Sequence, residues 1–460
     1  MQLLVLVATL LVLTIIGFYL GRSRAVSSVG GKERSLHSLP SYHGFYVAIW
    51  CAVPALLVFV AWLALEPQIL RAMLVDSLPP EAQSLPPERL GLLLNDIRNL
   101  ASGNILSRAA DPEMQQAAER YSRMLQISRM ALLVLVLALA IAGLLFARSR
   151  IAPRFRARNT VETVIMFFLI ASSVVAILTT VGIVLSLIFE ASRFFLRVSP
   201  VEFLFGLEWS PQMAMRADQV GAAGSFGAVP LFVGTLLIAF IAMCVAMPVG
   251  LMAAIYMAEY AHSRLRAVVK PVLEILAGIP TVVYGFFAAL TVAPFFRSVG
   301  SDAGLDISSE SALAAGVVMG IMIIPFVSSL SDDVITAVPQ SMREGSYGLG
   351  ATQAETIRRV IIPAALPGII GGFLLATSRA IGETMIVVMA AGLAANLTAN
   401  PFQAVTTVTV QIATLLVGDQ EFDSPKTLAA FALGLVLFCV TLTLNIIALR
   451  IVTKYREQYD

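Results

Sequence analysis

Long apolar runs alternate along the chain with shorter polar stretches. Nine of these runs approach the ~20 residues that an α-helix needs to cross the apolar core of a bilayer. The spans that we predict are residues 2–20, 45–65, 130–147, 162–190, 229–256, 271–296, 312–331, 366–392 and 427–451. The pattern therefore predicts an all-α polytopic membrane protein.

Composition agrees with this pattern, because 58% of the 460 residues are hydrophobic and only 13% are charged. A soluble domain carries about 25% charged residues. The net charge is only +2, so it gives no argument for a nucleic-acid partner. The three cysteines and three histidines show no metal-ligand spacing, and we find no GxSxG, HExxH or P-loop motif. Nothing in the sequence indicates an enzyme or a catalytic residue.

Basic residues in the short loops predict the orientation of the chain. With nine spans they all fall on one side, and they are Arg22, Arg24, Lys32, Arg34, Arg148, Arg150, Arg154, Arg156, Arg158, Arg264, Arg266, Lys270, Arg343, Arg358, Arg359, Lys454 and Arg456. The acidic residues of the opposite loops are Asp302, Asp306, Glu310, Asp419, Glu421 and Asp423. No positive segment precedes the first apolar run, so we expect a retained helix with its N-terminus outside. The C-terminus is then cytoplasmic.

Residues 66–129 differ from the rest of the chain, because they carry mixed charge and apolar residues at helical spacing. We expect a small extracytoplasmic helical module there, with the Pro-Pro pairs at 79–80 and 86–87 as rigid spacers. The basic segment 148–160 is expected to be a linker at the membrane surface that sets topology. We therefore divide the chain into residues 1–159, with three spans and the module, and residues 160–460, with six.

The stretch SMREGSYGLGATQAETIRRVIIPAALPG runs from Ser341 to Gly368 between two apolar runs. Its spacing resembles the EAA…G…I-LP cytoplasmic loop of the permeases of binding-protein-dependent ABC importers, although Gly345 and Ser346 replace the two alanines. In that family the loop fits a groove on the ATP-hydrolysing subunit. The residues to which the resemblance gives this coupling role are Glu344, Gly345, Gly350, Ala351, Ile362 and Pro363. The chain has no Walker motif, so the resemblance implies that ATP and Mg²⁺ are held by a separate polypeptide and that this chain binds no cofactor.

Local chemistry predicts how this loop folds. We expect two short helices, over 332–346 and 352–361, that meet at a turn where glycine adopts conformations that other residues avoid. Thr352 and Glu355 have the spacing of a capping box at the start of the second helix. Pro363 and Pro367 are expected to end that helix and to begin the next span. An ordinary polar loop that re-enters the membrane is the alternative.

Two charged residues lie inside the eighth predicted span. Arg379 is twelve residues beyond Pro367, roughly 18 Å along a helix that rises ~1.5 Å per residue, which places it near the middle of the bilayer. Glu383 lies four residues later, on the same face of a helix. Three interpretations remain open, namely a structural ion pair, a proton relay, and an anion path in which Arg379 attracts the substrate while Glu383 holds or releases the arginine. We favour the anion path and include Thr384 in it.

Other polar residues of the spans are interpreted more simply. Pro280 predicts a kink in the sixth span, where Thr281 helps to satisfy the freed backbone and Tyr284 lies nearby. Hydroxyl groups at Ser328, Ser329, Thr377 and Ser378 are suited either to an oxyanion or to hydrogen bonds between helices.

The run RAIGETM, from Arg379 to Met385, resembles the PstC-type subunit of the phosphate importer. The resemblance covers residues 160–452, with a type-1 transmembrane domain at about 229–449, and leaves residues 1–159 as an N-terminal extension. It implies the type I ABC importer fold in a bacterial cytoplasmic membrane. The implied partners are a PstA-like permease, two PstB-like ATPases and an extracytoplasmic PstS-like phosphate receptor.

The resemblance thus implies a permease subunit that carries inorganic phosphate. A permease for another oxyanion, such as sulfate or molybdate, is the nearest alternative. A self-sufficient secondary carrier or channel would need coupling-ion sites and has no use for the loop at 344–363. A third alternative is a sensor in which residues 66–129 bind a signal. Co-purification with an ATPase that substrate stimulates would discriminate between them.

Overall fold

The computed structural model describes residues 2–31, 33–83, 85–102, 112–211, 224–417 and 424–455. Lys32, Asp419, Glu421, Asp423 and Arg456, which contributed to the orientation prediction, lie outside these residues. In the described part nine helices are long and apolar enough to cross a membrane, as predicted: Leu3–Ser27, Pro40–Asp76, Pro112–Ser149, Ala157–Phe195, Val229–Tyr260, Thr281–Asp302, Ala312–Thr336, Gln353–Ile381 and Pro425–Lys454. The prediction of an all-α polytopic protein is confirmed. The chain forms two compact units, Met1–Leu178 and Thr179–Asp460.

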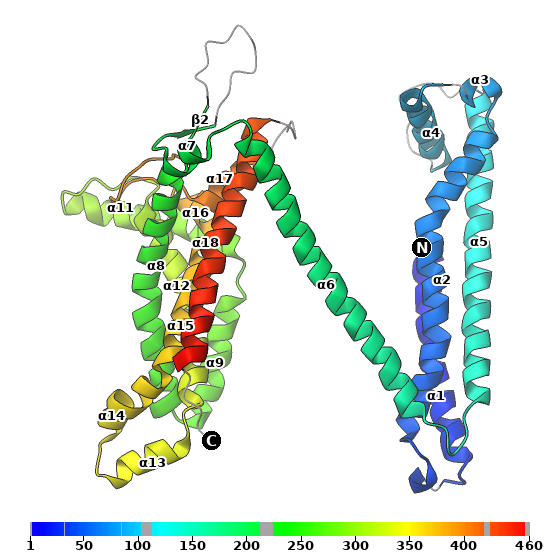
Figure 1. The fold of residues 1–460 in the computed structure, drawn as a ribbon, viewed down its shortest axis with the longest axis horizontal. Helices are drawn as coiled ribbons and strands as arrows, with labels where there is room; N and C mark the ends of the chain where they lie inside the picture. The colour runs from blue at the N-terminus through cyan, green and yellow to red at the C-terminus, as the bar shows by residue number, and fades with distance from the viewer. Residues whose placement is uncertain are drawn as a thin grey trace. The chain divides into compact units, whose positions relative to one another are not determined.

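The first unit is a bundle in which α1 (Gln2–Ser27), α2 (Pro40–Asp76) and α5 (Pro112–Ser149) lie side by side (Figure 1). A short 3₁₀ helix, η1 (Glu33–Ser35), lies between α1 and α2. Small and β-branched side chains such as Val47, Cys51, Val136 and Ala140 form its buried core. A Cβ atom at Gly143 would collide with the carbonyl oxygen of Trp50, so glycine is required where α5 crosses α2.

The expected helical module is built on extensions of α2 and α5 beyond the predicted spans. The helices α3 (Pro80–Gln83) and α4 (Pro87–Ala101) lie between these extensions in the sequence. Leu94 and Ile97 of α4 are buried with Leu74 and with the alanines at 117 and 118. The second proline of each Pro-Pro pair is the first residue of a helix, where its missing N–H costs nothing. The pairs therefore start helices rather than form the spacers that we expected.

The boundary between the units falls within α6 (Ala157–Phe195), a single 39-residue helix. Ala157 and Val161 at its start belong to the core of the first unit, whereas Ala191 and Phe194 near its end belong to a core of the second. The short elements α7 (Pro200–Phe205), β1 (Trp209–Ser210) and β2 (Ser225–Phe226) follow, and the two strands pair antiparallel.

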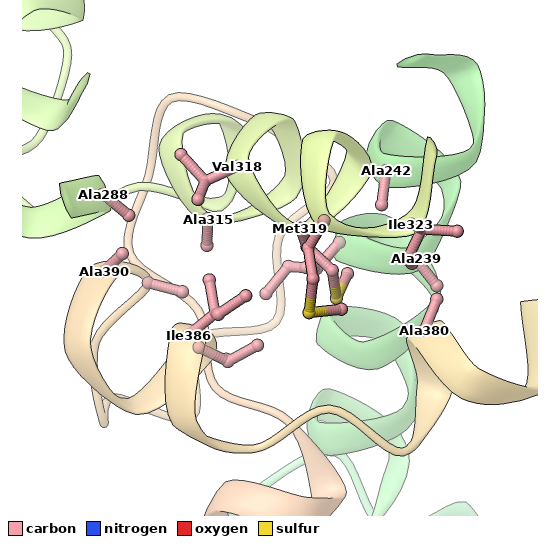
Figure 2. Close-up of a cluster of buried hydrophobic side chains, with 14 of the residues drawn as sticks. Ala239, Ala242, Ala288, Ala315, Val318, Met319, Ile323, Ala380, Ile386 and Ala390 are labelled. Atoms are coloured by element: carbon pink, nitrogen blue, oxygen red, sulfur yellow. The ribbon is translucent and has the colours of Figure 1, made fainter. Parts of the chain in front are cut away.

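The second unit is centred on α8 (Val229–Ile255) and α12 (Ala312–Thr336), which pack along each other beside α15 (Ile362–Ile381) and α18 (Pro425–Tyr455). Figure 2 shows how small side chains, among them Ala239, Ala242 and Ala315, surround Met319 in this core. A Cβ at Gly320 would lie 2.8 Å from the carbonyl oxygen of Ala242. Small residues thus bring the helices close enough for dispersion contacts, which stabilise helix packing in lipid.

The predicted sixth span, 271–296, starts too early, because the chain bends at Gly278-Ile279-Pro280. The kink predicted at Pro280 is therefore confirmed, but it lies before the span and not inside it. Before the bend lie the π-helical turn η2 (Tyr256–Tyr260) and the amphipathic helix α9 (Ser263–Ala277). After it, α10 (Thr281–Phe287), the π-helical turn η3 (Ala288–Val292) and α11 (Ala293–Asp302) form the span. The hydroxyl of Tyr284, and not that of Thr281, donates to the carbonyl of Leu276 across the bend, at 2.9 Å.

The predicted eighth span, 366–392, is also wrong at both ends. A continuous helix runs through α14 (Gln353–Thr356), the π-helical turn η4 (Ile357–Ile361) and α15, and it ends at Ile381. Pro363 and Pro367 lie within it and do not stop it, because the wider turn η4, in which the N–H of Ile362 donates to Ile357, directly precedes Pro363. The chain then continues into the separate helices α16 (Met385–Ala390) and α17 (Val408–Leu415).

Candidate functional site

The predicted coupling loop forms a helical hairpin at one end of the second unit (Figure 1). Its first helix is α13 (Gln340–Gly348). Our expectation of a helix over 332–346 is wrong, because 332–336 are the last turn of α12 and Pro339 separates the two helices. Gly350 has a φ of +85°, and the N–H of Ala351 donates to Ser346 while that of Gly350 donates to Tyr347. This is a Schellman ending, in which glycine adopts the left-handed conformation that the turn requires.

The second half of the hairpin starts as the sequence predicts. The Thr352 hydroxyl accepts from the Glu355 N–H at 3.3 Å, and the Glu355 carboxylate accepts from the Thr352 N–H at 2.9 Å. The two halves are joined by a hydrogen bond of 2.8 Å between the hydroxyls of Ser346 and Thr356, of which Thr356 is fully buried. The serine that departs from the alanine pattern therefore has a structural role in this chain.

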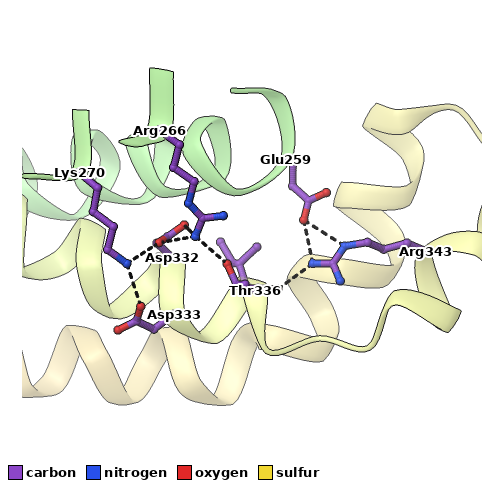
Figure 3. A network of polar contacts seen from close by, with 8 residues as sticks. Glu259, Arg266, Lys270, Asp332, Asp333, Thr336 and Arg343 are labelled. Carbon is purple, nitrogen blue, oxygen red and sulfur yellow. Dashed lines mark hydrogen bonds and ion pairs between the residues drawn. The ribbon is translucent and has the colours of Figure 1, made fainter. Parts of the chain in front are cut away.

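A buried ion pair fixes the hairpin to η2, the π-helical turn that directly follows α8. Nη2 of Arg343 lies 2.9 Å from Oε1 of Glu259 (Figure 3), and the side chains are 11% and 6% exposed. The same guanidinium donates to the carbonyls of Ile335 and Val338, and Gln353 donates to the carbonyl of Glu259 at 2.7 Å. From the sequence alone, Arg343 is only a signal of topology. Its role was missed because Glu259 lies 84 positions away.

The hairpin presents polar and apolar groups to its surroundings. Glu344, Gly345 and Gly350 are exposed, and Leu349 at the tip is 91% exposed. Ala351 and Ile362 are partly buried and Pro363 is exposed. The arrangement is a rigid, exposed helical projection whose tip residue is apolar.

Arg379 and Glu383 are not on one helix face, so the predicted geometry of the pair is wrong. Arg379 lies in the last turn of α15, and its guanidinium carbon is 5.7 Å from the ring centroid of Phe326. Glu383 lies after the helix has ended, and its Oε1 accepts from the N–H groups of Met385 and Ile386 at 3.1 and 3.4 Å. Across the described residues no ion pair joins the two side chains, which contradicts the structural-lock interpretation.

Glu383 acts locally as a cap for the short helix α16. Carboxylate acceptors at a helix N-terminus satisfy backbone donors that have no partner within the helix. Thr384 is the residue that precedes α16, and the hydroxyl of Thr409 donates to the carbonyl of Glu383 at 2.9 Å. The break Gly382–Thr384 is thus held by side-chain hydrogen bonds.

Arg379 faces a cavity of about 290 Å³ between α9, α12 and α15. Polar groups on its wall come from Lys270 and Glu274 of α9 and from Ser328, Ser329 and Asp332 of α12. The structure thus brings Arg379 together with two of the hydroxyls singled out in the sequence. Thr377 instead donates within its own helix, to the carbonyl of Phe373.

Asp332 is fully buried and is held by two cations of α9 (Figure 3). Nη2 of Arg266 lies 2.9 and 2.8 Å from its two carboxylate oxygens, and Nζ of Lys270 lies 3.0 Å from Oδ2. Lys270 also contacts Asp333 at 3.2 Å, and the hydrogen bond to Asp332 raises the pKa of its ammonium group. The sequence analysis missed this cluster. Arg266 and Lys270, four residues apart, were the available signal.

Comparisons with known proteins agree with this architecture. Residues 246–457 match the family described as binding-protein-dependent transport system inner membrane component, and residues 7–179 match the family described as phosphate ATP-binding cassette transporter. The probable ABC transporter permease protein YqgH of Bacillus subtilis is 35% identical over 56% of this chain and 80% of its own length.

Two relatives carry the name phosphate transport system permease protein. PstC of Mesorhizobium japonicum is 32% identical over 60% of this chain and 86% of its own length. PstC 1 of Mycobacterium tuberculosis is 34% identical over 55% of this chain and 82% of its own length. Both relatives are more than 30% identical to this chain over more than four fifths of their own length. This multi-pass membrane chain therefore belongs to the PstC family of binding-protein-dependent transport permeases.

Proposed function

We propose that the chain is the permease subunit of an ATP-driven importer and forms half of the pathway through which inorganic phosphate crosses the cytoplasmic membrane. The observation that carries this proposal is the cavity beside α15. It presents the guanidinium of Arg379, which among the described residues has no carboxylate partner. A cation at membrane depth is costly and usually serves a path. The names of the curated relatives favour phosphate as the anion.

Arg379 would attract the anion by charge and by its fork of N–H donors, which matches the oxygens of phosphate. Glu383 and Thr384 would act on the path differently from our first expectation. They hold the break between α15 and α16, so they would position Arg379 at the end of its helix. Glu383 would not bind the guanidinium in competition with the anion.

The helical hairpin would be the attachment point of the ATPase. Its Glu344, Gly345, Gly350, Ala351, Ile362 and Pro363 match the coupling loop, and the buried Arg343–Glu259 pair would transmit a displacement of α13 to α8. A rigid projection is suited to this purpose, because a flexible loop would absorb the movement.

The remaining parts of the transporter would be separate polypeptides. We propose a PstA-like permease as the other half of the pathway, two PstB-like ATPases that hold ATP and Mg²⁺, and a PstS-like receptor on the outside. The hairpin and the C-terminus would be cytoplasmic and the N-terminus extracytoplasmic, as the basic residues of the loops predict.

A permease for sulfate or molybdate remains the second candidate, because a guanidinium and hydroxyls suit any tetrahedral oxyanion. Reconstitution of the chain with its partner subunits in proteoliposomes separates the two. We expect ATP-dependent uptake of labelled phosphate that a tenfold excess of sulfate or molybdate does not suppress. ATP-dependent uptake of labelled sulfate or molybdate without uptake of labelled phosphate would overturn the assignment, and phosphate uptake without any ATPase would indicate a secondary carrier.

A further inference from the structure

The cavity beside Arg379 holds hydrogen-bond donors that lack acceptors. Ser328 is fully buried, and its hydroxyl has no hydrogen-bond partner within the described part of the chain. The guanidinium of Arg379 has five N–H donors, and its one recorded contact in that part is the ring of Phe326. Buried polar groups are normally paired, so an orphan hydroxyl on a cavity wall points to a partner that is not protein.

Lys270 contributes one further donor to the same cavity. An ammonium group has three N–H donors. Two of them are directed at Asp332 and Asp333, at 3.0 and 3.2 Å (Figure 3). Lys270 also lines the cavity, so one of its donors is left over beyond the two that the carboxylates accept.

The carboxylates on the wall do not use up these donors. Both oxygens of Asp332 are already bonded to Arg266 and Lys270. Glu274 lies where the cavity meets a second, more open one of about 570 Å³, and it forms no ion pair with the described cations of the inner cavity. An acceptor-only ligand with several oxygens is the chemistry that such a surplus of donors suits.

We propose that Lys270 and Ser328 complete, together with Arg379, a binding site for a tetrahedral oxyanion inside this cavity. The proposal rests on the proposed function and adds residues to the same path. The volume of about 290 Å³ has room for several water molecules at ~30 Å³ each, and hence for an anion with part of its hydration shell.

Asp332 balances the charge of Lys270 in this site. A fully buried carboxylate such as that of Asp332 is strongly disfavoured without a counter-ion, and Lys270 is one of its two counter-ions. When the site is empty, Asp332 and Asp333 compensate the charge of Lys270, and when an anion enters, the third donor of the lysine turns to it without leaving Asp332. Lys270 thereby joins the contents of the cavity to the contact between α9 and α12.

The test compares a substitution at Lys270 with one at Arg266, the two cations that contact Asp332. Lys270→Gln and Arg266→Gln each remove one cation from this carboxylate, but only Lys270 lines the inner cavity. In the reconstituted complex we expect Lys270→Gln to lower the maximal rate of phosphate uptake about tenfold, Lys270→Arg to recover at least a third of the wild-type rate, and Arg266→Gln to change it less than threefold. If both Gln variants lose phosphate uptake to the same extent, Lys270 acts only as a structural partner of Asp332, and the proposal is overturned.

A binding measurement on the receptor-free permease–ATPase complex keeps the two proposals separable. Millimolar inorganic phosphate should raise the melting temperature relative to chloride at equal ionic strength, since a ligand that binds the folded state stabilises it. The shift should fall at least twofold in Ser328→Ala, a small change that leaves the helix intact. Wild-type uptake together with an unchanged shift in Ser328→Ala would reject this site alone, whereas absence of phosphate uptake by the wild-type complex would reject the proposed function.

Discussion

At the scale of single residues, one property of Arg379 could be predicted from the sequence and another could not. The sequence identifies it as an unusual cation at membrane depth. It does not reveal that α15 ends two residues later, because the apolar run continues through Gly382 to Ala391 without a proline. The helix breaks where Glu383 caps the next one, and the break is also held by Thr409, whose hydroxyl donates to the Glu383 carbonyl from a position distant in the sequence.

Arg379→Ala is predicted to lower phosphate uptake about 10–100-fold, because a hydrogen bond to a charged group contributes about 1.5–3 kcal/mol. Arg379→Lys should retain part of the rate, since the charge survives and the fork of donors is lost. The measurement is ATP-dependent uptake in proteoliposomes. Co-purification of the ATPase serves as the assembly control, and a wild-type rate for Arg379→Ala would remove this residue from the path.

Glu383→Gln should instead lower thermal stability by about 1 kcal/mol, the usual cost of weakening a helix cap. Because Arg379 and Glu383 form no ion pair, the effects of Arg379→Ala and Glu383→Ala on melting temperature should add. Recovery of stability or of transport in the double variant would show that the side chains interact after all.

The Arg343–Glu259 pair is the strongest stability prediction at the residue scale. Arg343→Ala leaves a buried carboxylate without a partner and should cost about 3–5 kcal/mol, whereas Arg343→Ala with Glu259→Ala should recover a large part of that loss. The exposed pair Arg158–Glu162 is a control, since Arg158→Ala should lower the melting temperature far less than Arg343→Ala. Thermal unfolding of the purified chain measures all three variants. Equal losses of stability in Arg343→Ala and Arg158→Ala would show that the Arg343–Glu259 pair does not fix the hairpin.

At the scale of elements, the hairpin at 340–361 was the part most fully predicted. Its turn glycine and its capping box follow from rules that act over a few residues, and both are present. The predicted ends of the flanking helices failed for the opposite reason. Whether a helix continues through Pro363 depends on a π-helical turn, and whether the sixth span starts at 271 or 281 depends on packing, which periodicity does not encode.

Two alanine substitutions test the hairpin at matched positions. Gly350 has a φ of +85°, so Gly350→Ala places a Cβ in a left-handed conformation and should cost about 1 kcal/mol. Gly345 lies inside α13 with open space around it, so Gly345→Ala should be neutral or stabilising by about 0.5–1 kcal/mol. We expect co-purification of the ATPase to weaken only in Gly350→Ala. Equal ATPase binding in both variants would argue against the hairpin as the docking element.

At the scale of the whole molecule, hydrophobic runs predicted the number of spans, because nine helices in the described part of the chain have the length and apolarity that a bilayer demands. Hydrophobic runs do not show which spans pack together, because that depends on contacts between residues that are distant in the sequence. The buried cores give one relevant fact. The buried core of the three N-terminal spans consists of residues between 6 and 161, whereas all buried core residues of the second unit lie at Ala191 or later.

Removal of residues 1–156 is therefore predicted to leave the second unit folded. The shortened chain starts at α6, keeps the hairpin and Arg379, and loses no residue from the buried cores of the second unit. We expect it to insert and to co-purify with the ATPase. A shortened chain that is stable in the membrane but binds no ATPase would show that the first unit is needed for assembly.

Orientation in the membrane is the last whole-molecule prediction. If the basic loops face the cytoplasm, the α3–α4 module is outside, and the loop between α5 and α6 is inside. In a chain whose Cys51, Cys244 and Cys439 are replaced by alanine, Ala82→Cys should react with a membrane-impermeant thiol reagent added to intact cells, and Ala152→Cys should react only after lysis. The two positions flank one span, α5, so an odd number of crossings separates them. Labelling of both before lysis would mean that α5 does not cross the membrane, and the reversed pattern would place the hairpin outside, where no ATP is available to a docked ATPase.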